Sequence, residues 1–284
     1  MLDARSVVPA EASDSPSEGG EEDYRPFDLI AGDIGRGLIV ICDHATNLLP
    51  AAYGTLGLPQ HELERHIGYD IGADALTRAL ARQLGVPAVL SRFSRLLIDP
   101  NRGPDDPTLI PRLSDGAVVP GNARIDEAEW ARRTAAFYDP YHRAIETAIE
   151  AGLAAGVAPA IFSVHSFTPV WRGVPRPWHA GVLWDRDPRF AVPLIEMLRR
   201  DPRLIVGDNE PYSGALENDT LYRHGTMRGL AHALIEVRQD LIAEDEGVHD
   251  WTMRLVPVIE EILAVPDIHD IRHFGSAVGP VTTP

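Results

Sequence analysis

Gly37-Leu-Ile-Val-Ile-Cys42 is the stretch that decides the fold, and Asp43-His44 follows it directly. The run is short, apolar and rich in β-branched residues, which is typical of a strand buried on both faces of a parallel sheet. Similar runs occur at residues 87–90, 96–98, 160–164, 180–184 and 233–237. Helical patterns alternate with them at residues 71–84, 126–151, 188–200, 219–230 and 251–263. We therefore predict an α/β fold, a three-layer sandwich in which a mainly parallel, mixed sheet is flanked by helices.

The length of 284 residues is enough for one large domain with a sizeable core. The first two dozen residues are acidic and almost free of large apolar side chains, so burial cannot offset the entropy of ordering them. The last residues are small and end in proline. We expect a disordered tail at 1–25, a single domain at 26–274 and a flexible tail at 275–284.

The composition excludes several classes of protein. Cys42 is the single cysteine, so an internal disulfide and a thiolate zinc site are both excluded. The net charge of -16 opposes binding to nucleic acid or to an anionic membrane. No apolar run approaches the roughly 20 residues of a membrane span, and no basic-then-apolar leader begins the chain. We expect a cytoplasmic protein whose partner is a small molecule, with its oligomeric state open.

Two histidines follow or end predicted strands, at the edge where ligands bind in parallel sheets. His44 comes after the strand at 37–42, and His165 comes after the strand at 160–164. Either could be an ordinary polar loop residue, but together they could place two imidazoles on one zinc ion. Asp70 or Asn47 would supply a third ligand, and Asp70 is preferred because an anionic oxygen binds zinc better than an amide does.

Other polar residues lie at the same predicted edge. Glu236 and Arg238 share one side of the strand at 233–237, where burial without a partner or a function would be costly. Asn101 and Arg102 could bind a carboxylate, although Asp99-Pro-Asn101-Arg102 also has the composition of an exposed turn. His224 could reach a substrate from a loop or could mark a helix irregularity.

Five stretches in this order resemble the N-formylglutamate amidohydrolase family over roughly residues 37–263. They are Cys-Asp-His-Ala-Thr-Asn at 42–47, Tyr-Asp-Ile-Gly-Ala at 69–73, Ser-Arg-Leu-Leu-Ile-Asp-Pro-Asn-Arg at 94–102, Val-His-Ser-Phe-Thr-Pro at 164–169 and Ile-Glu-Val-Arg-Gln-Asp-Leu-Ile at 235–242. The family is distantly similar to zinc carboxypeptidases and to the succinylglutamate desuccinylase and aspartoacylase group. The resemblance implies a zinc exopeptidase-like architecture and an enzyme that cleaves formyl from N-formyl-L-glutamate or a related N-acyl acidic amino acid.

The resemblance also implies roles for individual residues. His44 and His165 would bind zinc or another divalent metal, and Glu236 would be the general base. Asn101 and Arg102 would hold a substrate carboxylate. The wider group has a glutamate three residues after its first histidine, where this chain has Asn47, so the third ligand stays open between Asp70 and Asn47.

The remaining assignments are alternatives. Arg95 or Arg238 would stabilise the oxyanion, and Arg172 or Arg223 would select a second carboxylate. His224, and Asn47 if it is not a ligand, would contact the substrate. Another N-acyl amino acid deacylase, a carboxypeptidase-like hydrolase and a non-catalytic small-molecule binding protein are the competing functions.

Overall fold

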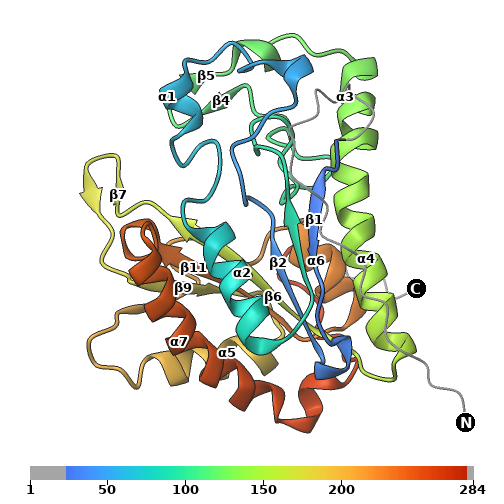
Figure 1. Ribbon diagram of the computed structural model, residues 1–284, viewed down its shortest axis with the longest axis vertical. Coiled ribbons are helices and arrows are strands. Elements are labelled where there is room, and N and C mark those ends of the chain that lie inside the picture. Colours follow the sequence, from blue (N-terminus) through green and yellow to red (C-terminus); the bar gives the residue numbers. More distant parts are fainter. Residues whose placement is uncertain (1–23, 280–284) are drawn as a thin grey trace, which may run out of the picture.

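The computed structural model describes residues 24–279, and the sheet at its centre is mixed. Within these residues the sheet has seven strands in the order β1-β3-β2-β6-β11-β9-β10. Strands β3, β2, β6 and β11 are parallel, β1 is antiparallel to β3, and β9 is antiparallel to β11. The expected mainly parallel, mixed α/β sheet is therefore confirmed (Figure 1).

The elements have the following bounds. The strands of the large sheet are β1 Phe27–Ile30, β2 Leu38–Cys42, β3 Ala88–Ser91, β6 Ala160–Phe167, β9 Ala180–Leu183, β10 Val206–Asp208 and β11 His232–Arg238. Two small hairpins are β4 Leu113–Ser114 with β5 Ala117–Val118, and β7 Val170–Trp171 with β8 Val174–Pro175. The α-helices are α1 Gln60–Leu63, α2 Ala73–Leu84, α3 Glu127–Arg133, α4 Asp139–Ala154, α5 Pro188–Leu198, α6 Thr220–His224 and α7 Asp245–Leu263.

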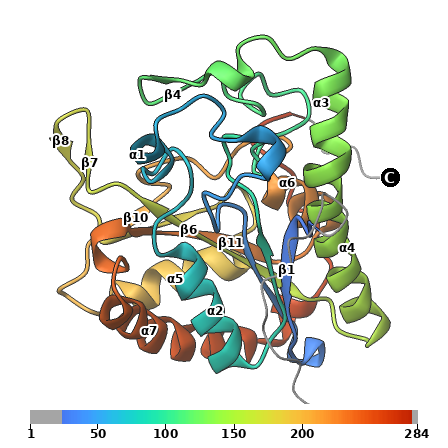
Figure 2. The same cartoon turned by 45° about the horizontal axis from the view of Figure 1, so that its top comes forward.

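Helices cover both faces of the sheet, which gives the expected three layers. Helices α2, α5 and α7 pack together on one face, where their apolar side chains meet those of alternate strand positions (Figure 1). Helix α4 packs on the other face and is continued at its N-terminal end by a π-helical turn and α3 (Figure 2). Strand β2 is fully buried along its length, as its apolar sequence predicts. No helix in the described part of the chain is both long and apolar enough to cross a membrane.

The register of the parallel strands fixes where the polar residues lie. Strand β6 pairs with β11 so that His165 lies directly beside Glu236. Strand β2 pairs with β6 on the other side, and Asp43 and His44 follow its last residue. Because β2, β6 and β11 run in the same direction, these side chains meet at one edge of the sheet.

The structure corrects two predicted elements. The predicted strand at 96–98 is wrong, because these apolar residues are buried in a turn and not in the sheet. The predicted helix at 219–230 is also wrong beyond its first turn, because α6 ends at His224 and a short 3-10 turn follows. The expected 1–25 tail falls mostly on residues outside the described ones, and so does the end of the expected C-terminal tail.

Candidate active site

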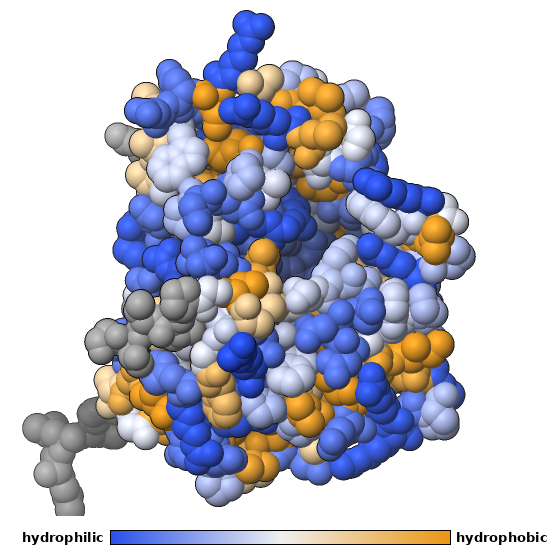
Figure 3. Space-filling model, turned by 180° about the vertical axis from the view of Figure 1, so that it is seen from behind, coloured by the Kyte–Doolittle hydropathy of each residue, from blue (hydrophilic) through white to orange (hydrophobic). Residues whose placement is uncertain are grey.

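A cavity of about 300 Å³ opens at the carboxyl end of β2, β6 and β11. Its walls also include residues of the two small hairpins and of the loop before α6. Seen from behind, the molecule is hollowed, and hydrophilic colours prevail around the hollow (Figure 3). In such sheets a ligand usually binds in a cavity that polar residues line at the carboxyl ends of the strands.

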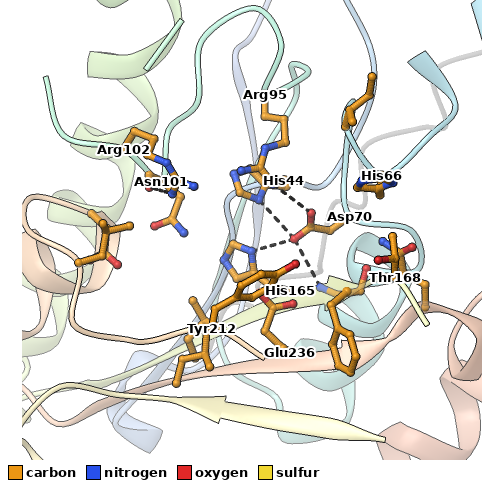
Figure 4. A pocket seen from close by; sticks show the side chains of 18 of the residues that line it. His44, His66, Asp70, Arg95, Asn101, Arg102, His165, Thr168, Tyr212 and Glu236 are labelled. Atoms are coloured by element: carbon orange, nitrogen blue, oxygen red, sulfur yellow. Dashed lines mark hydrogen bonds and ion pairs between the residues drawn. The ribbon is translucent and has the colours of Figure 1, made fainter. Parts of the chain in front are cut away.

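His44, Asp70 and His165 meet at the base of this cavity (Figure 4). Asp70 Oδ2 lies 2.8 Å from His165 Nδ1 and 3.3 Å from His44 Nδ1. One ligand atom from each of the three residues falls within 4.8 Å of the others, and all three side chains are buried. The structure thus groups Asp70 with the two histidines.

Asp70 is held in place by the backbone just before α2. Its N–H donates to the carbonyl of His44 at 2.9 Å, and its carbonyl accepts from Ala73 at 3.1 Å. Gly72, the residue before α2, has φ 81 and lies against the Ile242 carbonyl, so a Cβ there would come within 2.2 Å of that oxygen. A glycine is therefore required for the sharp turn that brings Asp70 to the histidines.

Two further carboxylates hold the far sides of the imidazoles. His44 Nε2 donates to Asp99 Oδ1 at 2.7 Å, and His165 Nε2 donates to Asp43 Oδ2 at 3.1 Å. Burial raises the pKa of Asp43, but the hydrogen bond and charge of His165 outweigh it and lower the pKa to about 2. Asp99 is likewise buried, yet Arg95 and His44 hold its pKa well below its usual range. Both carboxylates are therefore acceptors, which leaves Nδ1 of each ring for the cavity.

The charges around these rings favour a cation. Asp43, Asp70, Asp99 and Glu236 are all at most 7% exposed. Burial lowers the pKa of His165, but Asp43 and Asp70 outweigh it and raise the pKa to about 10. The same excess of negative charge that holds a second proton on this imidazole would attract a divalent metal to its Nδ1. Two imidazole nitrogens and a carboxylate oxygen are also a donor set that zinc accepts.

Glu236 lies beside this group and has an unused oxygen. Its Oε2 is buried without a hydrogen-bond partner among the described residues. Burial is the main cause that raises the pKa of Glu236 to about 7, and the charge of Asp70 adds to the rise. A carboxyl group with such a pKa can take up and release a proton near neutral pH.

Some of the other predicted residues line the cavity and some do not. Asn101, Arg102 and Arg95 are in its wall, and Arg95 donates to Asp99 through Nη2 at 2.7 Å. Figure 4 shows Asn101 and Arg102 on one side of the two histidines, and His66 and Thr168 on the other.

Three residues predicted to contact the substrate point elsewhere. Arg238 pairs with Asp240 at 2.7 Å, and His224 is buried with its Nε2 2.9 Å from His142 Nδ1. Asn47 donates to the carbonyl of Leu63 at 3.1 Å. None of the three is among the described residues that line the cavity.

The two arginines proposed for a second carboxylate also lie outside the cavity wall. Arg223 pairs with Glu146 at 3.1 Å, and Arg172 lies over the Trp171 ring. No sequence pattern assigned a role to Asp43, Asp99 or Tyr212, although Asp43 is next to His44 and Asp99 begins the stretch with Asn101 and Arg102.

The fold and this site define an α/β enzyme with a buried group of metal-binding type and an adjacent carboxyl base. The chain belongs to the N-formylglutamate amidohydrolase family, whose model matches residues 36–243. It is therefore a hydrolase that acts on amide bonds. The expected family and enzyme class are confirmed.

Solved structures that are similar to the chain over most of its length include the following two. A gene product of Agrobacterium tumefaciens is 32% identical with a TM-score of 0.80, covering 86% of this chain and 97% of its own. An N-formylglutamate amidohydrolase from Ralstonia eutropha is 24% identical with a TM-score of 0.58, covering 84% of this chain and 97% of its own. No curated protein matches the chain.

Proposed function

We propose that the protein is a zinc-dependent amidohydrolase that removes the formyl group from N-formyl-L-glutamate, or from a related N-acyl acidic amino acid. The observation that supports this most is the buried group of His44, Asp70 and His165 beside the unpartnered oxygen of Glu236. Family membership supplies the reaction class, hydrolysis of an amide bond.

Nδ1 of His44, Nδ1 of His165 and a carboxylate oxygen of Asp70 would hold the metal. When bound, a divalent metal there lowers the pKa of water and polarises the acyl carbonyl of the substrate. Asp43 and Asp99 fix the orientation of the rings through their bonds to Nε2. These bonds keep the protons on Nε2 and so leave Nδ1 as a donor of its lone pair.

Glu236 moves the proton that the reaction requires. Its Oε2 takes a proton from the attacking water and later gives it to the nitrogen of the leaving amine. The water oxygen forms the new bond to the acyl carbon, the C–N bond breaks, and the products are formate and glutamate. Burial of Glu236 excludes other water from this oxygen. It also raises the pKa of the carboxyl group to about 7, so that the group can both accept and release a proton near neutral pH.

Asn101 and Arg102 bind a carboxylate of the substrate. Asn101 Oδ1 accepts from the backbone N–H of Thr220 at 3.2 Å, so its Nδ2 is left as a donor for a ligand. Arg102 lines the cavity, its Nη1 donates to the Asn101 carbonyl at 2.8 Å and its Nε lies 3.9 Å from Asp106 Oδ2, so Nη2 is the nitrogen left for a ligand. Arg95 lies in the wall near Asp70 and would stabilise negative charge that develops on the acyl oxygen.

The test is an assay of amine and carboxylate release on one purified, zinc-loaded sample. Formyl-, acetyl- and succinyl-glutamate are supplied separately, and metal content is measured on the same sample. We expect about one zinc per chain, formate release from N-formylglutamate, and loss of activity with a chelator. Full activity without stoichiometric metal would contradict the metal-dependent mechanism, and release from a longer acyl group alone would assign another deacylase.

A further inference from the structure

Arg176 is a buried cation directly behind the wall of the cavity. It is 9% exposed and lies against the rings of Phe167, Trp171 and Tyr212, with its guanidinium carbon 5.7, 5.2 and 5.0 Å from their centroids. It forms no ion pair with any described carboxylate, whereas the similarly buried side chains of Arg133 and Arg189 pair with Glu129 and Asp187. Ring contacts offset only part of the cost of burying a charge. Arg176 therefore lacks an anion.

The hydrogen bonds of Arg176 determine how two cavity hydroxyls point. Its Nη1 donates to Tyr212 Oη at 3.0 Å and to Thr168 Oγ1 at 3.3 Å. A guanidinium has donors only, so both hydroxyl oxygens accept from it. The hydrogen of each hydroxyl must then point elsewhere, and both side chains line the cavity. Tyr212 and Thr168 thus face a ligand as donors backed by a positive charge.

A third side chain that lines the cavity has a donor without a partner among the described residues. Gln239 is 6% exposed, and its Nε2 is buried with no hydrogen-bond partner among the described residues. It lines the cavity just beyond the end of β11, beside the residues that follow β6. A buried amide N–H₂ that is left unbonded is costly, which indicates that a ligand satisfies it.

We propose that Thr168, Tyr212 and Gln239, backed by Arg176, form a second carboxylate-binding subsite. Thr168 lies across the two histidines from Asn101 and Arg102, so the two subsites flank the proposed metal position (Figure 4). The inference rests on the proposed function, in which Arg102 holds the first carboxylate. The substrate is therefore a dicarboxylate, and its second carboxylate comes either from the amino acid side chain or from the acyl group.

The test compares substrates that differ by one carboxylate. N-formylglutamate against N-formylglutamine probes a side-chain carboxylate, and N-succinylglutamine against N-butanoylglutamine probes an acyl carboxylate. The wild type is expected to prefer the dicarboxylate in one pair by roughly ten- to hundredfold in kcat/KM, the size of a lost charge-assisted hydrogen bond. The pair that shows the preference identifies the source of the carboxylate.

Variants connect the preference to these residues. Arg176→Met, Tyr212→Phe and Gln239→Leu should each reduce the preference several-fold, measured as the ratio of kcat/KM for the dicarboxylate to kcat/KM for the monocarboxylate. The last two variants keep Arg176, so they test the subsite even if Arg176→Met does not fold. Arg254→Met is the matched control, because Arg254 also lies over a tryptophan ring, that of Trp251, but is outside the cavity wall. It should keep the full preference.

A binding measurement separates this inference from the proposed function. Calorimetry with glutarate and butanoate, on zinc-loaded protein, should show tighter binding of glutarate in the wild type and a smaller difference in Arg176→Met. Selective glutarate binding without cleavage of any N-acyl amino acid would contradict the proposed function but support the subsite. Equal cleavage within both substrate pairs, or a preference that all three variants retain, would overturn the subsite.

Discussion

Replacing Asp99 by asparagine should weaken zinc binding more than the same change at Asp43. Asp99 Oδ1 accepts from His44 Nε2 and from the backbone N–H of Asn101, and its Oδ2 accepts from Arg95. None of these donors can become an acceptor while His44 keeps its lone pair on Nδ1. An asparagine N–H₂ must therefore face either Arg95 or His44, and in the second case His44 is forced to move its proton to the nitrogen that would bind metal.

The same change at Asp43 should weaken zinc binding less. Its Oδ1 accepts from the hydroxyls of Tyr141 at 3.0 Å and Thr220 at 2.7 Å, and both hydroxyls can turn to accept instead. An asparagine there can place its N–H₂ toward the hydroxyls and keep its oxygen on His165 Nε2. Loss of an outer partner of a metal-binding histidine usually costs 10- to 100-fold in metal affinity, so we expect about 10-fold for Asp43→Asn and about 100-fold for Asp99→Asn. These factors correspond to about 1.4 and about 2.7 kcal/mol.

The assay is zinc competition between the purified apo-protein and a chromophoric chelator of known affinity. Asp126→Asn is the control, because Asp126 caps α3 away from the cavity and asparagine is an equally good N-cap. Its zinc affinity should equal that of the wild type. If Asp99→Asn binds zinc as tightly as the wild type, or if Asp43→Asn is the weaker of the two, the orientation argument fails.

Four other predictions concern turnover, recognition and stability. Glu236→Gln should keep its zinc and lose roughly 10²- to 10⁴-fold in kcat, measured by formate release, and an unchanged kcat would exclude Glu236 as the base. Arg102→Met should raise KM for N-formylglutamate by at least roughly tenfold, the usual loss for a charge-assisted contact, whereas an unaltered KM would remove Arg102 from the substrate site. Burial lowers the pKa of His142 from 6.5 to about 3. Between these two pH values the folded state binds fewer protons than the unfolded state, so the free energy of unfolding should fall as the pH falls from 6.5 to about 3. Urea unfolding at several pH values checks this, and His142→Gln should show a shallower decline; an equal decline would refute the assignment. Phe162→Ala should lower the free energy of unfolding by about 3–5 kcal/mol, because Phe162 is fully buried and stacks on Phe190, and a loss below about 1 kcal/mol would contradict this packing argument.

The core strands could be predicted from the sequence because their apolar runs are buried on both faces. Strand β2 was predicted within one residue, whereas the four-residue strand β1, Phe27-Asp-Leu-Ile30, lies at the sheet edge and carries a weak pattern. The run at 96–98 is equally apolar, yet its burial comes from a packed turn. A short apolar run indicates burial but cannot distinguish a strand from another buried segment.

The residues of the site also differ in how far the sequence could predict their positions. His44, His165 and Glu236 follow or end strands, so parallel topology predicts that they lie at the same edge of the sheet, and the strand order β2-β6-β11 brings them close together. Asp99 and Asp43 bond to histidines 55 and 122 positions away in the chain, and such pairings depend on the exact packing of loops. Arg176 follows a small hairpin with no strong local pattern, and its importance appears only once its burial and its missing carboxylate are known.

The most direct test of the central claim is anomalous scattering at the zinc absorption edge from a crystal of the protein soaked in zinc. We predict one strong peak in the cavity, between Nδ1 of His44, Nδ1 of His165 and the carboxylate of Asp70. No peak there, or a sole peak at other residues, would contradict it.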